Sequence, residues 1–138
     1  MENIGIKRAV RRIALDESEG SPVFTLDLSD SGVQRAAIAA RDRIDAAQGL
    51  MGKSELTDGD RETVAELYTA IVDSLLGAGA MDTIAAYACD GTGKPVSDML
   101  VALTPLILYL AGEIGDMTAK ADAKAYARYT GGDDGSVL

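Results

Sequence analysis

The pattern of apolar residues changes from a two-residue to a helical repeat within one short stretch, Pro22-Val23-Phe24-Thr25-Leu26-Asp27-Leu28-Ser29-Asp30. Phe24, Leu26 and Leu28 fall on alternate positions, as in a strand with one buried face. The three polar residues at 29–31 can each cap a helix by accepting hydrogen bonds from its first backbone N–H groups. The stretch therefore predicts that a strand ends and a helix begins close to residue 29.

A less regular strand pattern precedes this one at residues 4–15, where aliphatic residues are interspersed among bases. Between the two patterns lies a dense turn signal, Asp16-Glu17-Ser18-Glu19-Gly20-Ser21-Pro22. We expect a β-hairpin that packs on helices or on another sheet edge, because an isolated hairpin is marginally stable. Residues 1–15 carry four bases and residues 16–30 five acids. We therefore also expect charge pairs between its two strands.

Four helical patterns follow the hairpin. An alanine-rich one runs to glycines 49 and 52, and a second begins at a capping-box-like Thr57 and stops at glycines 77 and 79. A short third pattern covers 80–89. After a loop at 90–95, a long fourth pattern runs from about 96 to 129, and Pro105 should kink it. Its first half is nearly apolar all round, as in a helix buried among others.

These patterns predict the α+β class, with an N-terminal β-hairpin followed by about four helices in a mainly α chain. A length of 138 residues suits one domain. We expect that domain over residues 1–130, with the hairpin at 1–28 and the helical body at 29–130. Residues 131–138, which contain three glycines, are expected to form a flexible tail.

Composition excludes several kinds of chemistry. With no His and one Cys, the chain has no Ser-His-Asp or Cys-His couple, no imidazole metal ligand and no disulfide within itself. We therefore predict a protein that is not an enzyme and has no cofactor and no metal. The net charge of −9 argues against nucleic-acid binding. All of it lies in residues 54–116, which hold 11 acids and 2 bases.

The sequence has no recognisable export signal. Arg11 and Arg12 fall where the apolar core of a secretory signal would lie. The longest uncharged run, Met99 to Gly112, has 14 residues, short of the roughly 20 that cross a bilayer. We therefore expect a cytoplasmic protein with no membrane segment, and we interpret the run as a core helix.

Each motif that suggests chemistry has a simpler interpretation. The loop Gly91-Thr92-Gly93-Lys94 lacks the remaining residues of a phosphate-binding loop. The alternating acids Asp58, Asp60 and Glu62 lack the later calcium ligands and suit a helix N-terminus. We interpret Asp16, Glu17 and Glu19 as a solvated turn, Cys89 as a small core residue near a helix end, and Ser136-Val137-Leu138 as a chance match to a C-terminal peptide motif.

The layout resembles the tail assembly chaperones of long-tailed phages, particularly those of prophages in Gram-positive bacteria. The resemblance lies in the hairpin that ends in Phe24-Thr25-Leu26-Asp27-Leu28 and is followed directly by Ser29-Asp30 and a charged helix. It also lies in the helical body that closes in Lys124-Ala125-Tyr126-Ala127-Arg128-Tyr129 before a glycine-containing tail. Alanine-rich helices and an aromatic content of 4% depart from the family pattern.

The resemblance implies a chaperone that binds the tape measure protein, keeps it soluble while the tail tube assembles, and is absent from the mature virion. The tail tube protein is a second partner of the family. Many members also have a longer form made by frameshifting, for which Gly131-Gly132 is a candidate site. Two other functions remain open: an acidic inhibitor or nucleic-acid mimic on a basic protein, and a structural tail component such as a terminator or connector.

The family pattern assigns no binding residues, so we choose them on physical grounds. The strand from Val23 to Leu28 offers an edge to which another chain can add. We predict Val23, Phe24, Leu26 and Leu28 as partner-binding residues, and the acidic helix faces as solubilising surface. The same hairpin edge also allows a homo-oligomer.

Overall fold

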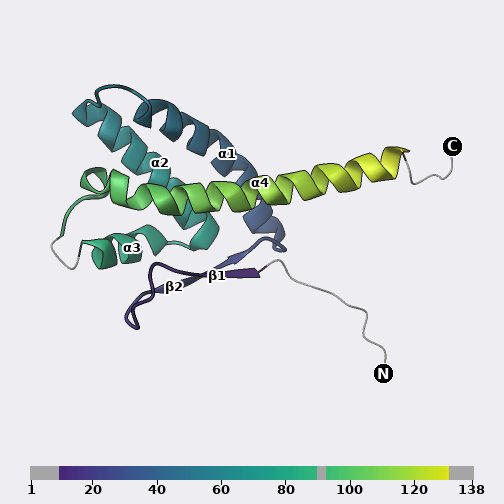
Figure 1. The fold of residues 1–138 in the computed structure, drawn as a ribbon, viewed down its shortest axis with the longest axis horizontal. Coiled ribbons are helices and arrows are strands. Elements are labelled where there is room, and N and C mark those ends of the chain that lie inside the picture. Colours follow the sequence, from purple (N-terminus) through teal and green to yellow (C-terminus); the bar gives the residue numbers. More distant parts are fainter. Residues whose placement is uncertain (1–9, 90–92, 131–138) are drawn as a thin grey trace.

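A two-stranded hairpin lies against one side of a helical body, and the longest helix crosses that body (Figure 1). The computed structural model describes residues 10–89 and 93–130, and for 118–130 it describes the backbone alone. The elements are β1 (Val10–Ala14), β2 (Val23–Asp27), α1 (Ser31–Met51), α2 (Asp58–Leu76), α3 (Ala80–Ala88), the 3-10 turn η1 (Val96–Asp98) and α4 (Leu100–Thr130). The predicted hairpin followed by four helices is confirmed.

Side-chain caps and glycines set the helix boundaries where the sequence predicts them. Asp30 caps α1, since its Oδ1 accepts hydrogen bonds from the backbone N–H groups of Gly32 at 2.8 Å and Val33 at 3.1 Å. Thr57 and Asp60 form a reciprocal capping box at the start of α2. Gly77 ends α2 with a φ of +116°, a conformation that other residues rarely adopt.

The hairpin register pairs Val10 with Asp27 and Ala14 with Val23. It places Arg11 opposite Leu26 and Arg12 opposite Thr25. The expectation of charge pairs between the strands is therefore wrong for these two arginines. Most acids of residues 16–30 lie in the turn or after β2 and not opposite β1. The other bases of the first segment, Lys7 and Arg8, lie outside the described residues.

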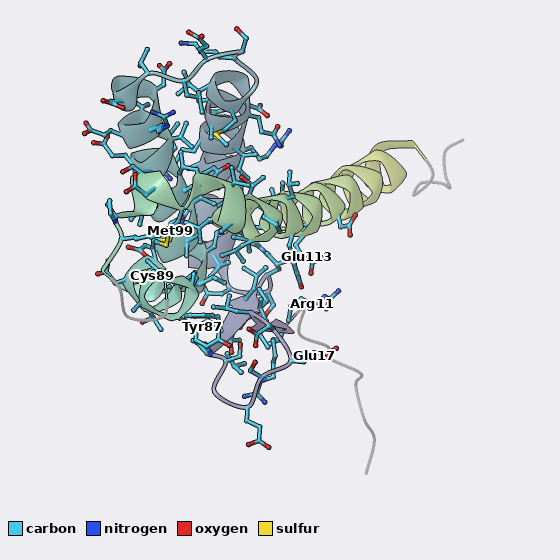
Figure 2. All side chains as sticks on the ribbon, turned by 60° about the vertical axis from the view of Figure 1, so that its left-hand side comes forward. Arg11, Glu17, Tyr87, Cys89, Met99 and Glu113 are labelled. Carbon is cyan, nitrogen blue, oxygen red and sulfur yellow. The ribbon has the colours of Figure 1, made fainter. Side chains whose placement is uncertain are left out.

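Arg11 instead joins the hairpin to α4. Its Nε lies 2.9 Å from Oε1 of Glu113, and the two side chains lie next to each other in Figure 2. The Nε–H is not aimed at this oxygen, so the contact is an ion pair without a hydrogen bond. Glu113 is mostly buried and Arg11 about half exposed.

The core joins the hairpin to all four helices. Ile13, Leu26 and Leu28 bury their side chains in it, together with Ile44 of α1 and Ile107 of α4. The alanine-rich side of α1 packs mainly on α2, where small side chains allow close approach. The buried Tyr68 hydroxyl lies 3.0 Å from Oγ1 of Thr104, so this polar group in the core has a partner.

Helix α4 continues through Pro105 to Thr130, and its C-terminal half extends beyond the body (Figure 1). Only one side of its first half faces the core. Val101 is 82% exposed and Leu108 is 52% exposed. The expectation that this half is buried on all sides is therefore wrong, because α4 lies on the surface of the helical body with helices on one side only.

One segment of α4, Leu100–Met117, is long and apolar enough to cross a membrane by length and composition, with a mean hydropathy of 1.5. The segment is longer than the uncharged run in the sequence because it includes two acids, Glu113 and Asp116. The bent pair of α2 and α3 passes the same test when taken together. Core helices of soluble proteins also pass it, so the absence of a membrane segment stays a prediction.

Candidate functional site

The structure divides the four residues predicted to bind a partner into two pairs. Val23 is 57% exposed and Phe24 is half-buried, so both can contact another chain. Leu26 and Leu28 are buried in the core and hold the hairpin on the helices. Of the predicted set, only the first pair can offer side chains to a partner.

A line of exposed residues follows α4 on the side away from the body. Its members stand at helical spacing and are apolar or small: Val101, Leu108, Gly112 and Gly115. Two of them are among the four large hydrophobic residues exposed on the described surface, and no other described element carries two. We call this set the α4 line.

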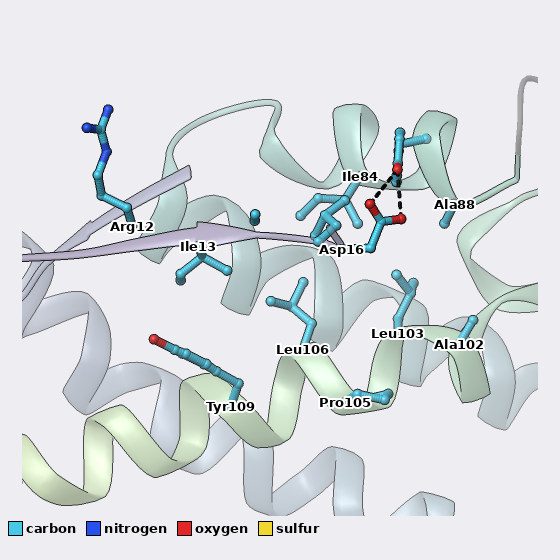
Figure 3. A pocket seen from close by; sticks show the side chains of 13 residues that line it. Arg12, Ile13, Asp16, Ile84, Ala88, Ala102, Leu103, Pro105, Leu106 and Tyr109 are labelled. Carbon is cyan, nitrogen blue, oxygen red and sulfur yellow. Dashed lines mark hydrogen bonds between the residues drawn. The ribbon is translucent and has the colours of Figure 1, made fainter. Parts of the chain in front are cut away.

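A cleft of about 520 Å³ lies between β1, α3 and α4 (Figure 3). Most of its wall is apolar, with Ile13 and Leu15 from the hairpin side facing Leu106 and Tyr109 of α4. Five consecutive residues at 12–16 form one wall, so the cleft follows the strand along its length. The volume falls within the range of ligand pockets in proteins.

The wall formed by residues 12–16 has a charged side chain at each end, Arg12 and Asp16. Asp16 accepts hydrogen bonds from the Tyr87 hydroxyl at both carboxylate oxygens, at 2.8 and 2.7 Å (dashed lines in Figure 3). This bond, with the backbone N–H of Ser18, lowers the pKa of Asp16 below its ordinary value. Arg12 lies at the other end of the wall and is exposed. The three turn acids are exposed, as predicted, and one of them, Asp16, also attaches the turn to α3.

A second, wider cavity of about 840 Å³ lies near the start of α4. Arg61, Cys89, Lys94 and Asp98 contribute to its lining. Cys89 is the C-terminal cap of α3, as its predicted place near a helix end requires, and its thiol lies 3.7 Å from the carbonyl oxygen of Ala86. Residues 90–92 of the glycine loop lie outside the described residues.

Two of the alternating acids at 58–62 make capping and ion-pair contacts at the start of α2. Asp60 accepts hydrogen bonds from the Thr57 backbone and from Lys53, and both contacts lower its pKa. Asp58 pairs with Arg61 at 3.1 Å. Within the described ranges, no three His, Cys, Asp or Glu side chains stand together in a way that could hold a metal ion. The tail motif at 136–138 lies outside those ranges.

Sequence patterns do not reveal the cleft, because its walls come together from distant parts of the chain. Tyr87 and Asp16 are 71 residues apart. Comparisons with protein-family models, with curated proteins and with solved structures give no match for this chain. The α4 line and the cleft are the features of the described surface on which a functional proposal can rest.

Proposed function

We propose that the protein is a non-enzymatic protein-binding module, a tail assembly chaperone of long-tailed phages, which keeps the tape measure protein soluble while the tail tube assembles. One observation carries the proposal: the α4 line places Val101 and Leu108 on the surface of a helix that is already anchored by its opposite side. A helix of a client protein can pack along such a line by ridges-into-grooves contact.

The charge distribution supports the solubilising part of this proposal. The line is apolar, whereas residues 54–116 as a whole carry the entire net charge of −9. A complex whose apolar contact is covered and whose remaining surface is acidic resists self-association, because like charges repel. An acidic inhibitor of a basic protein, the second candidate, would use the acidic surface itself and would leave the α4 line uncovered.

The proposal predicts a very long, coiled-coil-like reading frame immediately downstream, and the absence of such a frame would count strongly against it. The functional test is co-expression with the protein that this frame encodes. We expect this chain to raise the soluble fraction of that client, and we expect Val101→Glu and Leu108→Glu to abolish the gain. Ile38→Glu, on the 60% exposed Ile38 of α1, is the matched control and should keep it. A gain that survives both α4 substitutions, or no gain with the wild-type chain, would refute the proposal.

A further inference from the structure

The first half of α4 packs on the body by one side only, and its C-terminal half extends beyond the body (Figure 1). We propose that α4 pairs antiparallel with α4 of a second copy along the α4 line, about a two-fold axis midway between Gly112 and Gly115. The C-terminal half of each helix then lies along the first half of the other. The pair covers the α4 line in the free protein, so a client helix takes the place of the second copy.

The C-terminal half of α4 has no neighbouring element among the described residues. In Figure 1, no other labelled helix or strand lies beside its last turns, although the helix continues to Thr130. Isolated helices shorter than about 12–15 residues are marginally stable in water, because most helical stability in proteins comes from the packing of one face. An antiparallel second copy supplies such packing to this half.

Two glycines allow the helices to approach closely at the proposed axis. Gly112 and Gly115 are exposed, and a Cβ atom on either would meet no atom within 4 Å beyond the backbone of its own helix. The space beside them is therefore open in the single chain. With the axis between them, Gly112 of one copy lies beside Gly115 of the other. The distance between packed helices depends on the side chains at the contact, and here it can be short.

The residues farther from the axis are complementary in size. Val101 and Leu108 are the exposed large apolar residues of the α4 line. In the sequence, helical spacing continues from Gly115 to Ala119 and Tyr126. The proposed axis brings Leu108 beside the small Ala119 of the second copy. It also brings Val101 beside Tyr126, so both exposed apolar residues of each chain gain an apolar partner.

The distribution of charge favours the antiparallel direction. Residues 54–116, which include the first half of α4, hold 11 acids and 2 bases. Residues 117–130 hold one acid and three bases. Antiparallel pairing places the basic half of each helix along the acidic part of the other chain, whereas parallel pairing would place the two basic halves together.

Sedimentation velocity on the purified chain tests the dimer, and it needs no client. We expect a species of twice the 14.3 kDa chain mass. Gly112→Leu should raise the dimer dissociation constant at least about tenfold, because its side chain separates the two helices but meets open space in the single chain. Gly49→Leu is the matched control and should leave the constant unchanged, since Gly49 is an exposed glycine of α1 with similarly open surroundings.

Crosslinking determines the direction of the pair. In a Cys89→Ser background, a chain with both Leu108→Cys and Ala119→Cys should form a covalent dimer with a short bismaleimide. These two positions are about 16 Å apart along one helix, at about 1.5 Å per residue, so a short reagent cannot join them within a chain. Leu108→Cys alone should not be linked, because the two copies of position 108 are equally far apart along an antiparallel pair.

Three outcomes would overturn the proposal. The first is a wild-type chain that stays monomeric at every concentration. The second is a Gly112→Leu dimer as tight as that of Gly49→Leu. The third is linkage of Leu108→Cys alone, which would show a parallel pair. Each of these is measured without the tape measure protein, so none of them decides whether that client binds.

Discussion

The hydroxyl of Tyr87, near the end of α3, donates hydrogen bonds to both carboxylate oxygens of Asp16 in the hairpin turn. Together with the Arg11–Glu113 ion pair, this contact gives the hairpin one polar attachment to α3 and one to α4. A two-stranded sheet is marginally stable alone, so such attachments determine how rigidly β1 is held.

Removing the Tyr87 hydroxyl should change the titration of Asp16. In Tyr87→Phe we expect the pKa of Asp16 to rise toward its ordinary value of 3.8, because the bond that favours the charged carboxylate is lost. Carbon-13 NMR titration of the carboxyl measures this change. Tyr109→Phe removes another hydroxyl from the cleft wall and is the control, for which the pKa of Asp16 should not move.

The same bond predicts a pH dependence of stability. Because the pKa of Asp16 is lowered on folding, its contribution is present above 3.8 and is lost as the pH falls through the lower folded-state value. The difference in unfolding free energy between wild type and Tyr87→Phe should therefore shrink across that acidic range. A difference in urea unfolding that stays constant from neutral to acidic pH would contradict this account.

Truncation to alanine should lower the free energy of unfolding much more at the buried pair of predicted binding residues than at the other pair. Leu26→Ala should lower the free energy of unfolding by about 2–5 kcal/mol, since it leaves a cavity at a fully buried site. Val23→Ala, at an exposed position of the same strand, should cost much less. Urea unfolding of both variants measures this, and similar losses at the two sites would show that the hairpin packs differently.

The capping box of α2 gives a local prediction. Thr57→Ala should cost about 1 kcal/mol of stability, because the N–H of Asp60 loses its acceptor. Thr63→Ala is the control, since its hydroxyl bonds a carbonyl within the same helix and caps nothing. An equal cost for the two substitutions in urea unfolding would exclude a role of the cap.

The ion pair between Arg11 and Glu113 should couple the hairpin to α4 weakly. A double-mutant cycle with Arg11→Ala and Glu113→Ala should give a coupling of about 0.2–1 kcal/mol, since Arg11 is half exposed. The coupling should decrease with added salt. A coupling that is zero at low salt would mean that this ion pair does not help to hold the hairpin against α4.

Local signals in the sequence predict most of the fold. The caps at Asp30 and Thr57 and the glycines after Leu76 determine helix ends through short-range hydrogen bonds and backbone freedom, so they can be predicted without tertiary information. The register of the hairpin cannot be predicted in this way, because the number of charges on each strand does not determine which residues are paired. The exposure of Val101 and Leu108 depends on which side of α4 meets the body, and apolar composition alone does not determine that.

The candidate binding surface also depends on tertiary contacts that the sequence pattern does not show. An alternating strand pattern identifies Leu26 and Leu28 as one face but does not show whether the core or a partner covers it. The cleft is lined by residues of β1, α3 and α4, which are far apart in the sequence. A local sequence pattern does not show that these elements lie side by side.

Site-specific photo-crosslinking can show whether the proposed client, the tape measure protein, contacts the α4 line. A photoreactive amino acid replaces Leu108 on the line or Ile38 on α1, both of which are more than half exposed. During co-expression, we expect a crosslink to the tape measure protein from position 108 and none from position 38. Crosslinking from position 38 alone, or from neither position, would contradict it.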